Sequence, residues 1–179
     1  MTKIKILKNK SYYYNDGYFT DGSFIIVSEL IKTNNKEFEK IMLTNTPVQA
    51  INGKIELLSN PPRFKKLLEQ YSENIKNDNE LMPLKLMTTT NDKNNKTLII
   101  FYNRQAKKLT YIDKEYIDLF PKGIKLYQAD DSLSGCSCSL DDTYLGVIMP
   151  VHMKDKILPK ELALVEKELI SELDNVEIY

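Results

Sequence analysis

The sequence predicts an α+β fold, in which short antiparallel strands are combined with a few amphipathic helices. Residues 1–51 hold alternating or aromatic runs separated by Asp-Gly turns, which favour tight hairpins because glycine accepts a positive φ. Apolar residues recur at helical spacing from Phe64 to Ile75 and again from Leu162 to Leu173. Between these two stripes the chain has the pattern of further short strands, and strands with segregated helices are typical of α+β proteins.

Length and composition are those of one ordinary domain. The chain has 179 residues, 42% of them hydrophobic and 28% charged, so it can bury a core without disulfides or a metal. Its 25 basic and 25 acidic residues give a net charge of zero, which argues against a protein that coats nucleic acid by bulk charge. We identify no signal peptide and no membrane-spanning run, and we expect a cytoplasmic protein without membrane contact.

The use of residue types also bears on the source of the chain. Lys, Asn, Ile and Tyr are abundant and Trp is absent, which is the bias that AT-rich coding DNA produces. This bias indicates a bacterial or phage origin.

Residues 1–51 are predicted to form a β-meander with one short helix. The strand-like runs are residues 3–8, 12–14, 18–20 and 24–28, with turns at Asn15-Asp16-Gly17 and Asp21-Gly22. The helix is expected at residues 36–42.

Residues 52–151 are predicted to contain two units, each running from a short strand through a helix into further strands. The first has a strand at 54–58, a helix opened by Asn60-Pro61-Pro62, and strands at 84–90 and 97–102. The second has a strand at 108–112, a two-turn helix capped by Asp113, and strands at 124–128, 135–140 and 144–151. Such a repeat predicts two helices packed side by side on one face of an antiparallel sheet.

Residues 1–151 are thus expected to be a single α+β domain, and residues 152–179 a C-terminal helical appendage. The appendage has an apolar stripe with charged residues between its members, which are Leu162, Val165, Leu169 and Leu173.

The segment from residue 52 to 151 resembles a domain of the bacterial DNA sliding clamp. The resemblance is carried by the aromatic-led helix between Tyr111 and Pro121, the strand that starts at Ile124, and the closing run Val-Ile-Met-Pro-Val at residues 147–151. It implies paired helices that face DNA inside a ring. It also implies a pocket for a partner peptide, bordered by Val147, Met149, Pro150 and Val151. Soft Met and rigid Pro beside aliphatic side chains suit such a groove, although a buried strand closed by a proline has the same pattern.

Two features depart from the clamp pattern. Clamps end soon after the Met-Pro motif, whereas this chain continues from His152 to Tyr179 with a helix that would cover the pocket or mediate assembly. A ring also needs six such domains, so a chain with one domain would form either a homo-oligomer of six copies or no ring at all.

Candidate DNA contacts are basic residues near the two predicted helices, because binding that ignores sequence needs cations within reach of phosphates. The alternative is that they are solvated charges beside Glu69 and Glu73. The candidates are Arg63, Lys65, Lys66, Lys107, Lys108 and Lys114.

Other chemistry-bearing residues favour structural interpretations. The pairs Asp130-Asp131 and Asp141-Asp142 would serve a metal-dependent nuclease if they converged, but Asp is common in turns. Cys136 and Cys138 lie on one face of a strand, where they are poorly placed for a disulfide and indicate reduced thiols. With His152 they leave a zinc ligand set incomplete. Half of Tyr12, Tyr13, Tyr14 and Tyr18 should face the core and half an interaction surface.

The sequence therefore predicts a non-enzymatic, clamp-like protein of DNA replication, with no cofactor, metal or catalytic residue. Its expected partners are a protein such as a replication factor, double-stranded DNA and further copies of the chain. Two alternatives stay open: a metal-dependent nucleic-acid enzyme that uses the acidic turns, and an interaction or inhibitor module without a DNA role.

Overall fold

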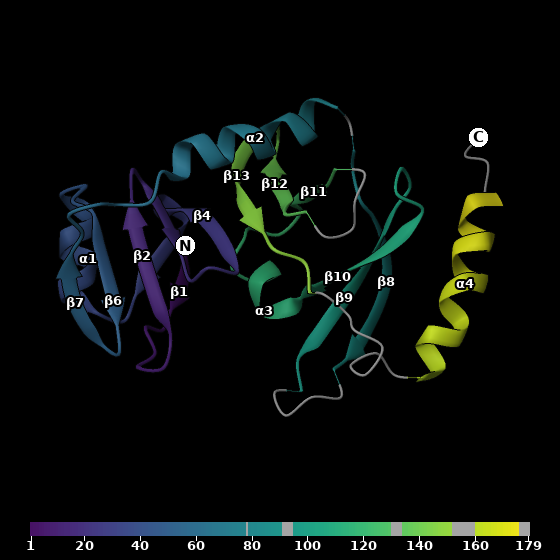
Figure 1. The fold of residues 1–179 in the computed structure, drawn as a ribbon, viewed down its shortest axis with the longest axis horizontal. Helices are drawn as coiled ribbons and strands as arrows, with labels where there is room; N and C mark the ends of the chain where they lie inside the picture. The colour runs from purple at the N-terminus through teal and green to yellow at the C-terminus, as the bar shows by residue number, and fades with distance from the viewer. Residues whose placement is uncertain (78, 91–94, 130–133, 152–159, 176–179) are drawn as a thin grey trace.

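The computed structural model describes residues 1–77, 79–90, 95–129, 134–151 and 160–175, and within the last range the side chains of residues 166–173. It has a mixed α+β architecture of mostly antiparallel sheets with four α-helices in the described part (Figure 1). The α+β prediction is confirmed at this level.

The main layer is an antiparallel sheet of eight strands, ordered β11-β12-β13-β4-β3-β2-β6-β7. In that order the strands are Lys125–Tyr127, Cys136–Leu140, Thr143–Ile148, Phe24–Val27, Tyr18–Thr20, Ser11–Asn15, Val48–Ile51 and Lys54–Leu57. The predicted meander is present as β2, β3 and β4, and its first turn has φ +50° at Asp16 and +80° at Gly17, as a tight hairpin requires. Strand β6 has no counterpart in the prediction.

Two smaller sheets complete the β structure. One has the antiparallel order β10-β9-β8, with strands Lys108–Asp113, Thr97–Asn103 and Met82–Thr89. The other pairs β1, Thr2–Ile4, in parallel with β5, Ile31–Thr33, which follows the short 3₁₀ helix η1, Ser28–Leu30.

The helices are α1, Lys36–Leu43; α2, Phe64–Lys76; α3, Lys114–Ile117; and α4, Lys160–Asn175. Asn35 caps the start of helix α1: its Oδ1 accepts from the amides of Glu37 and Phe38, each at 3.1 Å. Helix α2 begins later than predicted, after Arg63 rather than after Asn60, and Arg63 makes no side-chain capping bond. The reason is that the residue before a proline avoids the helical region, and two prolines follow Asn60 in succession.

The second unit's helix, α3, has one turn instead of two, but its predicted cap is present. The Asp113 carboxylate accepts from the amide of Glu115 at 3.0 Å. One turn is enough to bring Tyr116 into the main core.

Alternate residues of the eight-stranded sheet enter two different cores. On one face Phe19, Phe24, Ile26 and Ile148 join the largest cluster, which includes Tyr116 of α3. On the other face Phe64 and Leu68 of α2 pack against Val147, with Tyr13, Tyr18 and Ile25 around them. Neighbouring strand residues point to opposite faces, so α2 and α3 lie on opposite sides of this sheet. The expectation that both helices pack side by side on one face is therefore wrong.

The three-stranded sheet lies between the main core and α4 (Figure 1). Ile99, Phe101 and Ile112 face the main core. The opposite face of this sheet is covered by Leu169, Ile170 and Leu173 of α4, and its buried members are Leu98, Ile100, Tyr102, Leu109 and Tyr111. In the described part of the chain, no helix is long and apolar enough to cross a membrane.

Candidate functional site beside helix α2

Two hydrogen bonds, one just before helix α2 and one within it, hold the helix to the sheet that it covers. It lies across β12 and β13 (Figure 1). Near its start, Asn15 Nδ2 donates to the Pro62 carbonyl at 2.9 Å. Further along, the Ser137 hydroxyl donates to the Tyr71 carbonyl. Gly135 permits this close packing, because a Cβ there would lie 2.7 Å from Val147 Cγ1 and 2.9 Å from Tyr71 Cε1.

An apolar pocket of about 180 Å³ opens along one flank of α2. Helix α2, the start of β4 and the end of β13 all contribute to its wall. The lining residues are Gly22, Phe24, Ile25, Leu67, Tyr71, Val147 and Met149. Leu67 is 40% exposed, so an apolar side chain stands at the rim of an apolar cavity. Such a pocket can take an apolar side chain of another molecule.

Two of the four residues predicted to border a partner pocket line this one. Val147 and Met149 face α2, whereas Pro150 is buried and Val151 packs into the core under α4. The chain leaves the eight-stranded sheet where β13 ends at Ile148. The Met149 amide still donates to the Ser23 carbonyl at 2.8 Å, but the Val151 amide donates to the carbonyl of Tyr111, in the three-stranded sheet, at 2.8 Å. The run Val-Ile-Met-Pro-Val thus passes from one sheet to the other.

Sequence reasoning missed Leu67 and Tyr71 as pocket residues, because both belong to the predicted buried stripe of α2. The helical spacing does hold a signal. Leu67 lies on the edge of the arc centred on Phe64, Leu68 and Ile75, and an apolar residue at such an edge is the first to meet solvent.

The basic residues predicted to contact DNA do not share one face. Lys65 and Lys66 are exposed on α2 and Arg63 is exposed just before it, whereas Lys107 and Lys108 lie at the turn into β10. Lys114 belongs to α3, across the large sheet from α2, and forms an ion pair with Asp118. Among the described residues, Arg63, Lys65 and Lys66 make no ion pair.

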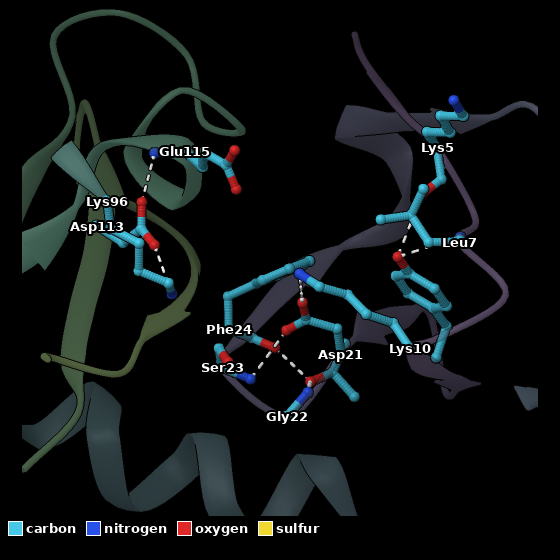
Figure 2. A network of polar contacts seen from close by, with 12 residues as sticks. Lys5, Leu7, Lys10, Asp21, Gly22, Ser23, Phe24, Lys96, Asp113 and Glu115 are labelled. Carbon is cyan, nitrogen blue, oxygen red and sulfur yellow. Dashed lines mark hydrogen bonds and ion pairs between the residues drawn. The ribbon is translucent and has the colours of Figure 1, made fainter. Parts of the chain in front are cut away.

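A second cluster surrounds a hollow of about 560 Å³ beside α3. Lys10 Nζ lies 3.3 Å from Asp21 Oδ2, and Lys96 Nζ lies 2.8 Å from Asp113 Oδ2 (Figure 2). Both ammonium groups also face the Tyr116 ring, at 5.8 and 5.5 Å from its centroid. Burial opposes ionisation of these lysines, but the carboxylates and Tyr116 outweigh it and hold their pKa above 10.5.

The geometry of this second cluster indicates a structural role. Asp21 and Asp113 retain only 4% and 1% of their side-chain exposure, and each needs a cation at that depth. The Lys10–Asp21 pair lies within the N-terminal hairpins, and the Lys96–Asp113 pair ties the start of β9 to the start of α3. The contact of Lys10 with the Tyr116 ring joins these two parts.

The remaining candidate metal-binding or catalytic residues have structural roles where the structure describes them. Asp141 and Asp142 are exposed in the β12–β13 turn, with φ of +48° and +62°. Cys136 and Cys138 are fully buried on one face of β12, and burial raises the pKa of both thiols. Within the described ranges, no three His, Cys, Asp or Glu residues gather as a metal site. Asp130, Asp131 and His152 lie outside the described residues.

The tyrosines of the first hairpin divide as expected between two faces. Tyr12 and Tyr14 are buried in the main core, and Tyr13 and Tyr18 face the α2 side. The outward pair packs around α2, so these rings help to seat the helix.

Comparison with known proteins adds no relative: no protein-family model, no curated protein and no solved structure matches this chain. The resemblance to sliding clamps stays a prediction, and the geometry beside α2 is the basis for the function proposed below.

Proposed function

We propose that this chain is a non-catalytic protein-binding module that takes an apolar side chain of a partner protein into the pocket beside α2. The observation that carries the proposal is the pocket itself, with Leu67 exposed at its rim and Val147 and Met149 in its wall. Methionine adapts to differently shaped apolar ligands, and a preformed concave apolar site is where one anchor residue contributes most to affinity.

The clamp-like part of the original expectation has weaker support. Helices that line a ring must lie side by side, whereas α2 and α3 pack on opposite faces of the sheet. Partner binding needs only the α2 flank and does not depend on a ring. A role in replication depends on the resemblance alone.

The proposal is tested with a displayed library of random peptides, selected on the immobilised full chain. Retained peptides are synthesised, and their affinity is measured by fluorescence anisotropy for the wild type and for Leu67→Ser. We expect an apolar residue in every retained peptide and an affinity at least about tenfold lower for Leu67→Ser, because truncation of a central contact commonly costs that much.

The matched control is Leu43→Ser, on α1, where the side chain is 85% exposed. Both variants should melt at the wild-type temperature, since neither leucine is buried. Peptides that bind the wild type and Leu67→Ser equally well would refute the proposal, as would a selection that enriches no peptide.

A further inference from the structure

The eight-stranded sheet has one covered edge and one open edge. Beside β11, the Leu81 amide donates to the Leu126 carbonyl at 2.7 Å, and the Gln128 amide donates to the Asn79 carbonyl at 3.1 Å, so this edge is covered. The other edge is β7, at the end of the molecule opposite α4 (Figure 1). Among the described residues, no strand pairs with the outer side of β7. A strand of another molecule can add to a sheet at such an edge.

The ladder between β6 and β7 fixes which backbone groups of β7 face outward. The two turn residues have φ +52° and +77°, as a two-residue hairpin requires, and the Leu58 amide donates to the Pro47 carbonyl at 3.0 Å. Hydrogen-bonded and non-hydrogen-bonded pairs alternate along an antiparallel ladder. Along this register the non-hydrogen-bonded positions of β7 are therefore Ile55 and Leu57. Their amide and carbonyl groups point to the open edge, where they have no backbone partner in the described part of the chain.

The side chains of β7 carry opposite charges on either side of Ile55. Lys54 and Glu56 are exposed on one face of the strand, whereas Ile55 packs against the main core on the other face. Within the described ranges neither charge has an ion-pair partner, and Glu56 Oε2 accepts from Gln49 Nε2 at 3.1 Å. A lysine on an edge strand usually discourages pairing with other chains. Here the acid two positions later makes the strand complementary to itself.

Charge selects one register for a second copy of β7 on this edge. Outward-facing groups must lie opposite outward-facing groups, so Ile55 can face Ile55, Leu57 or Gly53 of the second copy. With Ile55 opposite Ile55, Lys54 and Glu56 form a non-hydrogen-bonded pair, where side chains are closest, and the two-fold axis repeats it. With Ile55 opposite Leu57, Glu56 meets Glu56; with Ile55 opposite Gly53, Lys54 meets Lys54. Larger shifts leave most of the four-residue strand unpaired.

We propose that two copies of this chain associate through antiparallel β7–β7 pairing, with Lys54 of each copy opposite Glu56 of the other. The interface is isologous and extends the eight-stranded sheet across a two-fold axis. Four residues from each copy form a small interface, so we expect a weak dimer with a Kd on the order of 100 μM. The inference is independent of the pocket beside α2, because β7 contributes no residue to that pocket.

Charge substitutions in the full chain test the register, with dimerisation measured by sedimentation velocity over a range of concentrations. Lys54→Glu and Glu56→Lys each place two like-charged pairs across the two-fold axis, and each should weaken dimerisation at least about tenfold at low salt. An equimolar mixture of the two variants should dimerise like the wild type, because opposite charges meet again. The control Lys32→Glu makes the same charge change at an exposed position of β5 and should leave dimerisation unchanged.

Amide hydrogen exchange locates the interface on the backbone. The amides of Ile55 and Leu57 should exchange about twofold more slowly when half of the chains are dimers, because only the monomer exposes them. The amides of Lys54 and Glu56 face β6 and should be protected at every concentration.

Three results would overturn the proposal. The first is a chain that stays monomeric at concentrations up to about ten times the expected Kd. The second is a dimer that tolerates both single charge substitutions, or a mixture of the two variants that does not dimerise. The third is a dimer in which exchange slows elsewhere but not at Ile55 and Leu57, since the copies would then meet at another surface.

Discussion

At the scale of residues, backbone geometry accounts for several side chains that carry catalytic chemistry in other proteins. Asp141 and Asp142 occupy adjacent positive-φ positions in a hairpin turn, as Asp16 does in the first turn. Asp and Asn tolerate this conformation better than most residues, because their short polar side chains make local hydrogen bonds. Their exposure in a tight turn needs no metal to explain it.

Gly146 is the position where backbone geometry is most restrictive. Its φ is +146°, and a Cβ there would lie 2.0 Å from the Ile25 carbonyl oxygen in the neighbouring strand. We predict that Gly146→Ala lowers the free energy of unfolding by at least about 3 kcal/mol, because β13 and β4 must separate. Denaturant unfolding followed by circular dichroism measures the change.

Gly17→Ala is the matched control for that prediction. Gly17 also has a positive φ, +80°, but a Cβ there would meet nothing within 4 Å. Its loss should be about 1 kcal/mol, the cost of the conformation alone. Equal losses at the two positions would show that the close approach of β13 to β4 is not what limits Gly146.

At the scale of elements, the sequence predicts those segments whose pattern is local. Helix α2 is found from the spacing of Phe64, Leu68 and Ile75, and the cap of α3 from Asp113. It misses β5 and β6, because each is too short for an alternating pattern to stand out. The pocket could not be predicted for a similar reason. The helical pattern around Leu67 can be read from the local sequence, but Gly22 and Met149 reach the pocket from segments far away in the chain.

Helix α4 shows how one charged residue can weaken the docking of an apolar helix. Leu169, Ile170 and Leu173 cover the small sheet, and Glu166 lies one turn before Ile170 on the same helix. Burial raises the pKa of Glu166 above its ordinary value of 4.5. Burial, and then the charge of Glu166, raise the pKa of Tyr111 on the facing strand.

The raised pKa of Glu166 predicts tighter docking of α4 at acid pH. A folded state that holds the proton more strongly gains stability below pH 4.5 and loses it as pH rises through the raised pKa. Glu166→Gln should therefore slow amide hydrogen exchange in α4 by about two- to fivefold at neutral pH, with allowance for solvent screening at a partly exposed group. It should have little effect at pH values where Glu166 is protonated.

Glu168→Gln is the control for α4, because Glu168 is exposed on the same helix. It should leave exchange unchanged at both pH values. If Glu166→Gln and Glu168→Gln slow exchange alike, the general loss of negative charge is responsible, and the buried position of Glu166 has no special part.

At the scale of the whole molecule, the decisive contact joins strands that are far apart in sequence. Strand β13 pairs with β4 through Gly146–Ile26, Val147–Ile25 and Ile148–Phe24. This pairing merges the N-terminal meander and the expected clamp-like segment into one eight-stranded sheet. Strand patterns show that both strands exist, but a period of two specifies a face and no partner, so the sequence could not predict which edge β13 would meet.

Buried polar groups also join the sheets across long distances. The Gln128 side chain, at the end of β11, accepts from Thr110 Oγ1 at 2.7 Å and from Asn103 Nδ2 at 3.2 Å. The Leu81 amide, which leads into β8, donates to the Leu126 carbonyl at 2.7 Å. These hydrogen bonds make the position of the three-stranded sheet depend on the eight-stranded sheet.

The merged sheet predicts that residues 52–179 do not fold without residues 1–51. A cut between 51 and 52 severs the β6–β7 hairpin and leaves β13 without its partner, and the main core loses Phe19, Phe24, Ile26 and Phe38. Cys136 and Cys138 report the result, because both are fully buried in that core. Their thiols should resist Ellman's reagent in the full chain until circular dichroism shows global unfolding, and they should react at once in the fragment. A fragment with protected thiols and dispersed amide signals would instead show that residues 52–179 fold without residues 1–51.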